Sequence, residues 1–168
     1  MALLETFYPS EIQDSTYVIP FEEWKQKGYN GVIFDIDNTL VPHGVAADER
    51  SIALFQRLKD LGFSTMLLSN NKEPRVKSFA NQVGASYIFK ARKPALKNYY
   101  KAMEEMGTTP QTTLFVGDQL FTDVWGAKRA GIYSILVKPI HPKEEIQIVL
   151  KRYLEKIVLF FYNRKIKK

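Results

Sequence analysis

Two carboxylates, Asp35 and Asp37, stand two residues apart where a short apolar run, residues 32–34, comes to an end. An apolar run rich in β-branched residues predicts a buried strand. Such a strand presents both acids at its carboxyl end, where ligands bind in open α/β sheets. Neighbouring carboxylates repel each other unless a cation or a shared proton intervenes. The pair therefore indicates metal-assisted chemistry, although a lone D-x-D is more often a turn or a helix cap.

Polar side chains also follow three further apolar runs, at residues 63–68, 87–89 and 113–116. If the runs are parallel strands, their carboxyl ends meet at one edge of the sheet, and residues distant in sequence converge there. A carboxylate cluster facing a lysine and a hydroxyl suits a phosphoryl group bound through a cation. The side chains concerned are Ser69 and Asn70, then Lys93, then Asp118 with Asp123 five residues on.

Segments whose apolar residues recur at helical spacing lie between these strands, and the predicted helices position the strand ends. One helix is predicted after Asp48, which can cap it, with Ile52, Leu54, Phe55, Leu58 and Leu61 as its apolar face and Gly62 as its end. Others are predicted at residues 21–27, 76–83, 95–106 and 123–130, and near Lys143, with a fifth strand at 133–137. This alternation predicts an α/β fold with a doubly wound parallel sheet, formed as a single domain over residues 1–168. Residues 1–19 have no clear period and are expected to lie as an arm over the domain.

The composition limits the chemistry. The chain has 168 residues and no cysteine, which excludes disulfides, thiolate nucleophiles and cysteine-bound metals. His43 and His141 are the only histidines, so a multi-histidine site is excluded as well. Any metal must be held mainly by oxygen, which favours Mg²⁺. Neither a signal-peptide pattern nor a run of about 20 apolar residues is present, so we expect a cytoplasmic protein.

The positive charge collects at the C-terminal end, in residues 143–168, which we expect to form a basic amphipathic helix. Its apolar residues favour packing on the sheet in the first turns. Beyond Lys156 the chain becomes apolar on all sides and then strongly basic, which predicts weak, salt-sensitive binding to an anionic membrane. A dimer interface or an RNA contact could use the same residues, although no strong nucleic-acid motif occurs. The predicted apolar stripe is Ile146, Val149, Leu150, Tyr153, Leu154, Ile157, Val158 and Phe161.

Taken together, the motifs over residues 31–137 resemble those of the haloacid dehalogenase superfamily of aspartate-nucleophile phosphatases. The neighbouring residues are similar to the YqeG-type branch of subfamily IIIA, which is related to the mitochondrial phosphatidylglycerophosphate phosphatases. The resemblance implies a capless core with an open active site, because one helix and one strand fill each interval where a cap could be inserted. The matching segments are Asp35-Ile36-Asp37-Asn38-Thr39, Ser69, Lys93-Pro94, and Gly117-Asp118 with Asp123.

The same resemblance implies roles for these residues. Asp35 would attack phosphorus and carry an aspartyl-phosphate, and Asp37 would serve as general acid and base. Mg²⁺ would be held by the Asp35 carboxylate, the Asp37 backbone carbonyl and Asp118, with Asp123 as a further ligand or a partner of the ligands. Ser69, Asn70 and Lys93 would bind the phosphoryl group, and Thr39 would support the first loop.

We therefore expect a Mg²⁺-dependent phosphomonoester hydrolase, with phosphatidylglycerophosphate as a candidate substrate. Two alternatives stay open. One is a phosphatase of a soluble small molecule or nucleotide, and the other is a regulatory or binding module that uses the basic tail on RNA or a membrane. The phosphate loops of P-loop and dinucleotide-binding proteins do not occur in the chain. The oligomeric state does not follow from the sequence.

Overall fold

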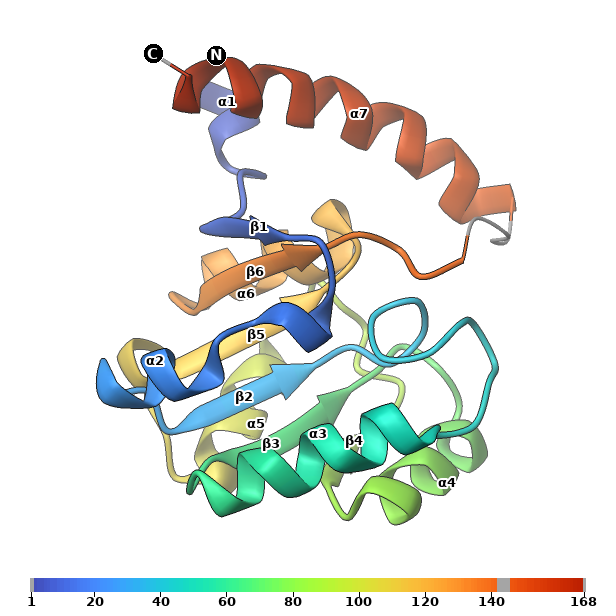
Figure 1. The fold of residues 1–168 in the computed structure, drawn as a ribbon. Helices are drawn as coiled ribbons and strands as arrows, with labels where there is room; N and C mark the ends of the chain where they lie inside the picture. The colour runs from blue at the N-terminus through green and yellow to red at the C-terminus, as the bar shows by residue number, and fades with distance from the viewer. Residues whose placement is uncertain (1, 142–145, 168) are drawn as a thin grey trace.

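A six-stranded parallel sheet forms the centre of the molecule in a computed structural model, which describes residues 2–141 and 146–167 (Figure 1). Its strand order is β1-β6-β5-β2-β3-β4. Strand β2 lies between β3 and β5 and ends immediately before Asp35. The predicted α/β class with a doubly wound parallel sheet is confirmed. The strands are β1 Glu11–Gln13, β2 Gly31–Phe34, β3 Ser64–Leu68, β4 Ser86–Ile88, β5 Thr113–Gly117 and β6 Tyr133–Val137.

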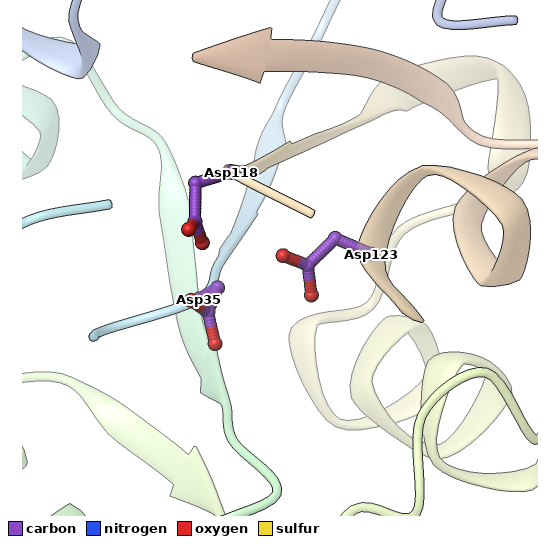
Figure 2. A group of neighbouring side chains, drawn as sticks. All are labelled: Asp35, Asp118 and Asp123. Carbon is purple, nitrogen blue, oxygen red and sulfur yellow. The ribbon is translucent and has the colours of Figure 1, made fainter. Parts of the chain in front are cut away.

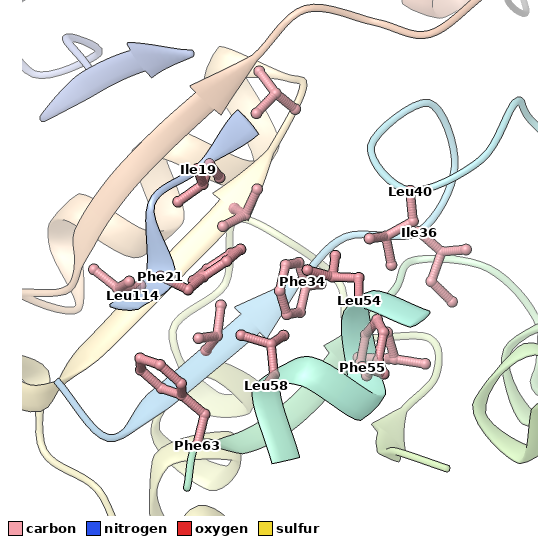
Figure 3. Close-up of a cluster of buried hydrophobic side chains, with 14 of the residues drawn as sticks. Ile19, Phe21, Phe34, Ile36, Leu40, Leu54, Phe55, Leu58, Phe63 and Leu114 are labelled. Atoms are coloured by element: carbon pink, nitrogen blue, oxygen red, sulfur yellow. The ribbon is translucent and has the colours of Figure 1, made fainter. Parts of the chain in front are cut away.

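Helices cover both faces of the sheet because successive strand residues point to opposite sides. Phe34 of β2 packs with α2, α3 and α4 in the cluster drawn in Figure 3, while its neighbour Ile33 packs with α5 and α6 on the other face. Both side chains are fully buried. The helices are α1 Ala2–Glu5, α2 Phe21–Gln26, α3 Glu49–Asp60, α4 Glu73–Val83, α5 Lys97–Met106, α6 Trp125–Arg129 and α7 Ile146–Ile166.

The helix ends follow the predicted signals closely. Asp48 caps α3 by accepting a hydrogen bond from the backbone N–H of Ser51 at 2.7 Å. Gly62, Gly84 and Gly107 follow their helices with positive φ, the conformation that favours glycine. Ile52, however, was wrongly placed on the apolar face of α3: its side chain is 44% exposed, whereas Leu54, Phe55 and Leu58 are buried.

The first 19 residues are more regular than the predicted arm. Residues 11–13 form β1, a sixth strand that pairs in parallel with β6 at the edge of the sheet. Three residues are too few to show a strand period, so the sequence could not reveal this pairing. The following turn reaches the loop after β2: Thr16 Oγ1 donates to the Thr39 carbonyl at 2.8 Å, and the Tyr17 hydroxyl donates to the Leu40 carbonyl at 2.5 Å. The N-terminal segment therefore supports the loop that carries Asp35 and Asp37.

The two intervals where a cap could be inserted contain only elements of the core. Residues 40–68, all described, hold a loop, α3 and β3, and residues 70–92, also described, hold α4, β4 and a short loop. The expectation of a capless core is confirmed.

Helix α7 lies along the β1 edge of the molecule, with its C-terminal end beside α1 (Figure 1). Lys165 of α7 pairs with Glu5 of α1 at 2.9 Å, and the rings of Tyr162 and Tyr8 lie 5.3 Å apart. The start predicted near Lys143 falls outside the described residues. No helix in the described parts of the chain is long and apolar enough to cross a membrane.

The predicted packing face of α7 is wrong for most of its residues. Glu155, Val158 and Tyr162 are the buried residues of this helix, and the half-buried Arg152 lies on the same side. Most of the predicted stripe faces solvent instead, together with Phe160. We call these six residues the outer face of α7; they are 53–71% exposed and comprise Ile146, Leu150, Tyr153, Leu154, Ile157 and Phe160.

Candidate active site

Three buried carboxylates converge beyond the ends of β2 and β5. Asp35 follows β2, Asp118 follows β5, and Asp123 lies in the π-helical turn Leu120–Val124 that precedes α6. One oxygen from each lies within 4.8 Å of the others, and Figure 2 shows the three side chains pointing toward a common space. The parallel topology therefore joins residues more than 80 positions apart into a single acidic cluster.

Lys93 is the principal counter-charge of this cluster. Its ammonium nitrogen lies 2.7 Å from Asp35 Oδ1 and 2.7 Å from Asp123 Oδ1, and its side chain is only 3% exposed. Asp123 Oδ2 accepts a hydrogen bond from the Gln119 backbone N–H at 3.2 Å. Both oxygens of Asp123 are thus engaged, so this residue fixes Lys93 and the turn after β5.

Thr39 lies between the two remaining carboxylates. Its hydroxyl oxygen is 3.2 Å from Asp35 Oδ2 and 3.0 Å from Asp118 Oδ1. One hydroxyl proton can serve only one of these oxygens at a time. Asp35 Oδ2 and Asp118 Oδ1 are therefore a pair of incompletely compensated anionic oxygens on the same side of the cluster.

Burial and mutual repulsion govern the protonation of this group. Burial raises the pKa of Asp35 to about 6, with Asp123 and Asp37 adding to the rise and Lys93 opposing it. Burial likewise raises the pKa of Asp118 well above its usual range, and the charges of Asp35 and Asp123 add to the effect. For Lys93, burial lowers the pKa, but the neighbouring carboxylates outweigh burial and the net shift is upward. A divalent cation would relieve the excess of negative charge.

The donor set fits Mg²⁺, which prefers hard oxygen ligands. Asp35 and Asp118 provide carboxylate oxygens, and no histidine or cysteine belongs to the cluster. The Asp37 carboxylate is not part of the cluster. These residues could therefore hold a divalent cation.

The Asp37 carboxylate points to a separate set of donors. The Gly44 backbone N–H and Arg75 Nη2 lie 2.8 and 3.0 Å from its Oδ1, and Asn71 Nδ2 lies 3.3 Å from its Oδ2. Burial raises the pKa of Asp37, but the Gly44 hydrogen bond and the Arg75 charge outweigh burial and hold the pKa below its usual value. Two aspartates of one motif thus have opposite pKa shifts.

Ser69 and Asn70 lie beside the cluster, as predicted. Ser69 is buried, and its hydroxyl accepts a hydrogen bond from the Asn71 backbone N–H at 3.1 Å. Asn70 bonds to the Lys93 backbone in both directions, accepting from its N–H at 2.7 Å and donating to its carbonyl at 3.3 Å. Asn70 therefore fixes the loop that carries Lys93, and its amide is already engaged in that contact.

A hollow of about 400 Å³ opens above Asp35, Asp37, Ser69, Asn70 and Lys93. Its other wall is formed partly by α7, through Gln147, Ile148 and Lys151. A larger groove of about 890 Å³ lies between α7 and strands β1 and β6, but Asp118 is the only predicted site residue that lines it, so the smaller hollow is the candidate active site. Although the core is capless, one side of the site is bordered by the C-terminal helix of the chain.

Four side chains near these carboxylates were not predicted. Asn71 and Arg75 lie in the turn before α4 and in its first turn, and their four-residue spacing could have indicated that both face the end of β3. Arg152 and Glu155 of α7 bond to Asp118 and to the Leu120 backbone. No sequence motif marks these two residues. His43, which was left out of the predicted site, lines the hollow, with its Nδ1 3.9 Å from Asp37 Oδ1.

Comparison with known proteins agrees with this geometry. Residues 43–131 match the family model of the haloacid dehalogenase-like hydrolases. The chain is 35% identical to the probable phosphatase YqeG of Bacillus subtilis over 97% of its own length and 95% of that protein. It is also 30% identical to phosphatidylglycerophosphate phosphatase 1 of Arabidopsis thaliana, over 92% of this chain but only 47% of that longer protein.

Among solved structures, the cobalt-bound deoxy-D-mannose-octulosonate 8-phosphate phosphatase of Haemophilus influenzae superposes with a TM-score of 0.55. The match covers 67% of this chain and 70% of that one, at 17% identity, and it supports the fold alone. The family model and the full-length similarity to YqeG show more than the fold. The chain belongs to the haloacid dehalogenase-like hydrolases and is a phosphatase that hydrolyses phosphoric monoesters.

Proposed function

We propose that this phosphatase works through Asp35 as a nucleophile, with Mg²⁺ bound by Asp35, Asp118 and the Asp37 carbonyl. The observation that carries the proposal is the buried Asp35 carboxylate with the buried Lys93 ammonium 2.7 Å away, both lining one polar hollow together with Asp37. A bound cation would screen the negative charge of both the carboxylates and the phosphoryl group. Lys93 and Ser69 would hold the phosphoryl oxygens, and Asn70 and Thr39 would fix the two loops.

Asp37 would supply and remove the proton. In the first step Asp35 attacks phosphorus, the bond to the ester oxygen breaks, and Asp37 protonates the departing alkoxide. In the second step Asp37 takes a proton from water, which attacks the aspartyl-phosphate and releases inorganic phosphate. A phosphoryl dianion raises the pKa of a neighbouring carboxylate, so substrate binding would favour the protonated Asp37 required for the first step.

A membrane-lipid phosphate such as phosphatidylglycerophosphate is the substrate that we favour. The Arabidopsis relative is named for that lipid, and the outer face of α7 would bring the site to a bilayer. Six exposed apolar residues on one helix side, with Lys156 beside them and Arg164 and Lys167 near the C-terminus, match the pattern of a helix in the plane of an anionic interface. Cations near such a surface contribute about 1 kcal/mol each to binding.

Turnover of a substrate panel tests the proposal. Phosphatidylglycerophosphate in vesicles, glycerol phosphate, nucleotides and sugar phosphates would be offered with Mg²⁺ and with a chelator. We expect activity only with Mg²⁺, highest on the lipid, and loss of about 10⁴-fold or more in Asp35→Asn. Asp60→Asn, which makes the same change on the exposed surface of α3, should leave activity unchanged. Absence of all turnover, or full activity in Asp35→Asn, would contradict the mechanism.

A trapping experiment tests the covalent step. With an aryl phosphate, whose leaving group needs no proton, Asp37→Asn should still form the aspartyl-phosphate but hydrolyse it slowly. Mass spectrometry of acid-quenched protein should then find phosphate on a peptide that contains Asp35. If one equivalent of the aryl alcohol has been released, no inorganic phosphate has yet appeared, and the quenched protein carries no phosphate, the intermediate is excluded.

A further inference from the structure

Helix α7 makes a direct polar contact with the proposed metal ligand Asp118. Arg152 donates from Nη2 to Asp118 Oδ2 at 2.5 Å and from Nη1 to the Asp118 carbonyl oxygen at 2.5 Å. One guanidinium thus holds both the side chain and the backbone of this residue. A planar guanidinium fork restricts the orientation of its acceptors more than a lysine ammonium would.

The contact divides the two oxygens of the Asp118 carboxylate between different partners. Oδ2 is taken by Arg152, while Oδ1 lies on the opposite side, 3.0 Å from the Thr39 hydroxyl and toward Asp35. Because a carboxylate is planar, fixing Oδ2 and the backbone carbonyl also fixes the direction of Oδ1. Arg152 therefore leaves Asp118 free to present one oxygen to a cation beside Asp35.

Glu155 holds Arg152 in this position. Its Oε2 accepts from Arg152 Nη1 at 2.9 Å, and its Oε1 accepts from the Leu120 backbone N–H at 2.9 Å. Glu155 is 4% exposed, which is rare for a glutamate without a specific partner. Leu120 begins the turn that carries Asp123, so one turn of α7 contacts both chain segments that supply acids after β5.

Stability alone is a weak explanation for this arrangement. Desolvation of a buried ion pair often cancels its Coulombic attraction, and apolar residues of similar size can replace such pairs without loss. An apolar side chain at position 152 would bury the same surface but could not orient Asp118. The segment before α7 also contacts the loop after β2 that carries Asp35 and Asp37, which we call the catalytic loop. The Ile140 N–H donates to the Asn38 carbonyl at 3.1 Å, and the His141 N–H donates to Asn38 Oδ1 at 3.3 Å.

We infer that Arg152 is a positioning residue for the metal ligand Asp118, and that Glu155 positions Arg152 in turn. This inference rests on the proposed Mg²⁺ site and extends the functional unit to the C-terminal helix. Substitution of residues that orient a metal ligand typically weakens metal binding 10- to 100-fold.

Calorimetric titration of the full chain with Mg²⁺, without substrate, tests the inference. We expect Arg152→Gln to weaken binding about tenfold or more, Arg152→Lys to weaken it less, and Glu155→Gln to have the smallest effect. Arg57→Gln is the matched control, because Arg57 also forms a forked pair with a carboxylate, that of Glu22, but on the exposed surface. Circular dichroism melting of each variant reports separately on folding.

The outcomes separate the two proposals. If the wild-type protein binds no Mg²⁺, or Asp118→Asn binds it normally, the proposed metal site fails. If the wild type binds Mg²⁺ and folded Arg152→Gln binds it equally well, only the positioning role is overturned. Tighter binding by Arg152→Gln would also overturn it, since Arg152 would then oppose the cation by charge repulsion.

Discussion

The acidic cluster and the outer face of α7 depart in opposite ways from the usual distribution of side chains. Asp35, Lys93, Asp118 and Asp123 are charged and buried, whereas the six apolar residues of the outer face are more than half exposed. Burial of charge and exposure of large apolar groups both reduce stability, so each region is better explained by binding than by folding. The two regions differ in what would bind.

Most charges of the cluster are paired within the cluster, whereas the six side chains of the outer face stay more than half exposed. Lys93 and Arg152 pair with the buried carboxylates, and the uncompensated charge is confined to the oxygens beside Thr39. A single small cation would complete that site. The outer face instead extends over four turns of a helix, and only an extended surface could cover it. We therefore expect single substitutions in the acidic cluster to have large effects on stability or metal binding. On the outer face of α7 each substitution should have a small effect, and the effects should add.

The largest effect is expected for Lys93→Met, which keeps the length of the side chain but removes its charge. Asp35 and Asp123 would be left buried without their counter-charge, at a cost of about 3–5 kcal/mol. Urea unfolding in metal-free buffer measures the loss. Lys101→Met, at an exposed lysine 3.6 Å from Glu105, should change stability by less than about 1 kcal/mol. Equal urea midpoints for Lys93→Met and Lys101→Met would show that the charge of Lys93 does not contribute to stability.

A smaller effect is expected from pH. Because the pKa of Asp35 is about 6 in the folded state and about 3.9 in an unfolded chain, the folded protein binds more protons between about pH 4 and 6. The contribution of Asp35 to stability must therefore fall as pH rises through that window. In metal-free buffer, Asp35→Asn should reduce this fall by about 2 kcal/mol, as measured by urea unfolding at several pH values. Asp60→Asn should follow the wild-type curve, whereas parallel curves for wild type and Asp35→Asn would refute the assigned shift.

The smallest effect on stability is expected on the outer face of α7. The double substitution of Leu154 and Ile157 by Gln should change the free energy of unfolding by about 0.5 kcal/mol or less at each site, since both side chains are exposed. Co-sedimentation with anionic vesicles should nevertheless weaken about tenfold or more. Val158→Ala, on the buried side, should lower stability by about 1–2 kcal/mol and leave vesicle binding intact. Unchanged vesicle binding in the double variant would exclude the outer face as a membrane contact.

The core of the fold was predictable because its signals are local. Asp48 and Gly62 mark the ends of α3, and the apolar runs before Asp35 and Asp118 are long enough to predict buried strands. The edge strand β1 was missed because three residues are too few to establish a strand period, and its position depends on pairing with β6. The acids of the candidate site and Lys93 were predicted from the sequence, but Arg75 was not. Its contact with Asp37 depends on how α4 packs against the sheet.

The rotation of α7 could not be predicted from hydrophobicity. The helix has apolar residues on two sides: Val158 and Tyr162 on one, Leu154 and Ile157 on the other. Hydrophobicity alone therefore does not indicate which of these two sides is buried. Arg152 resolves the ambiguity through its contact with Asp118, a residue 34 positions away. The orientation of this helix is thus set by polar contacts together with the apolar packing of Val158 and Tyr162.

Asn38, which has a left-handed backbone conformation with φ of 63°, links the loop after β2 to the chain before α7. Its carbonyl and side-chain oxygen both accept from the chain just before α7, so opening of the catalytic loop must release the amides of Ile140 and His141. Their exchange rates would therefore report on a loop more than 100 residues earlier in the sequence. Slower exchange at these two amides on addition of Mg²⁺ would measure how strongly the cation closes that loop.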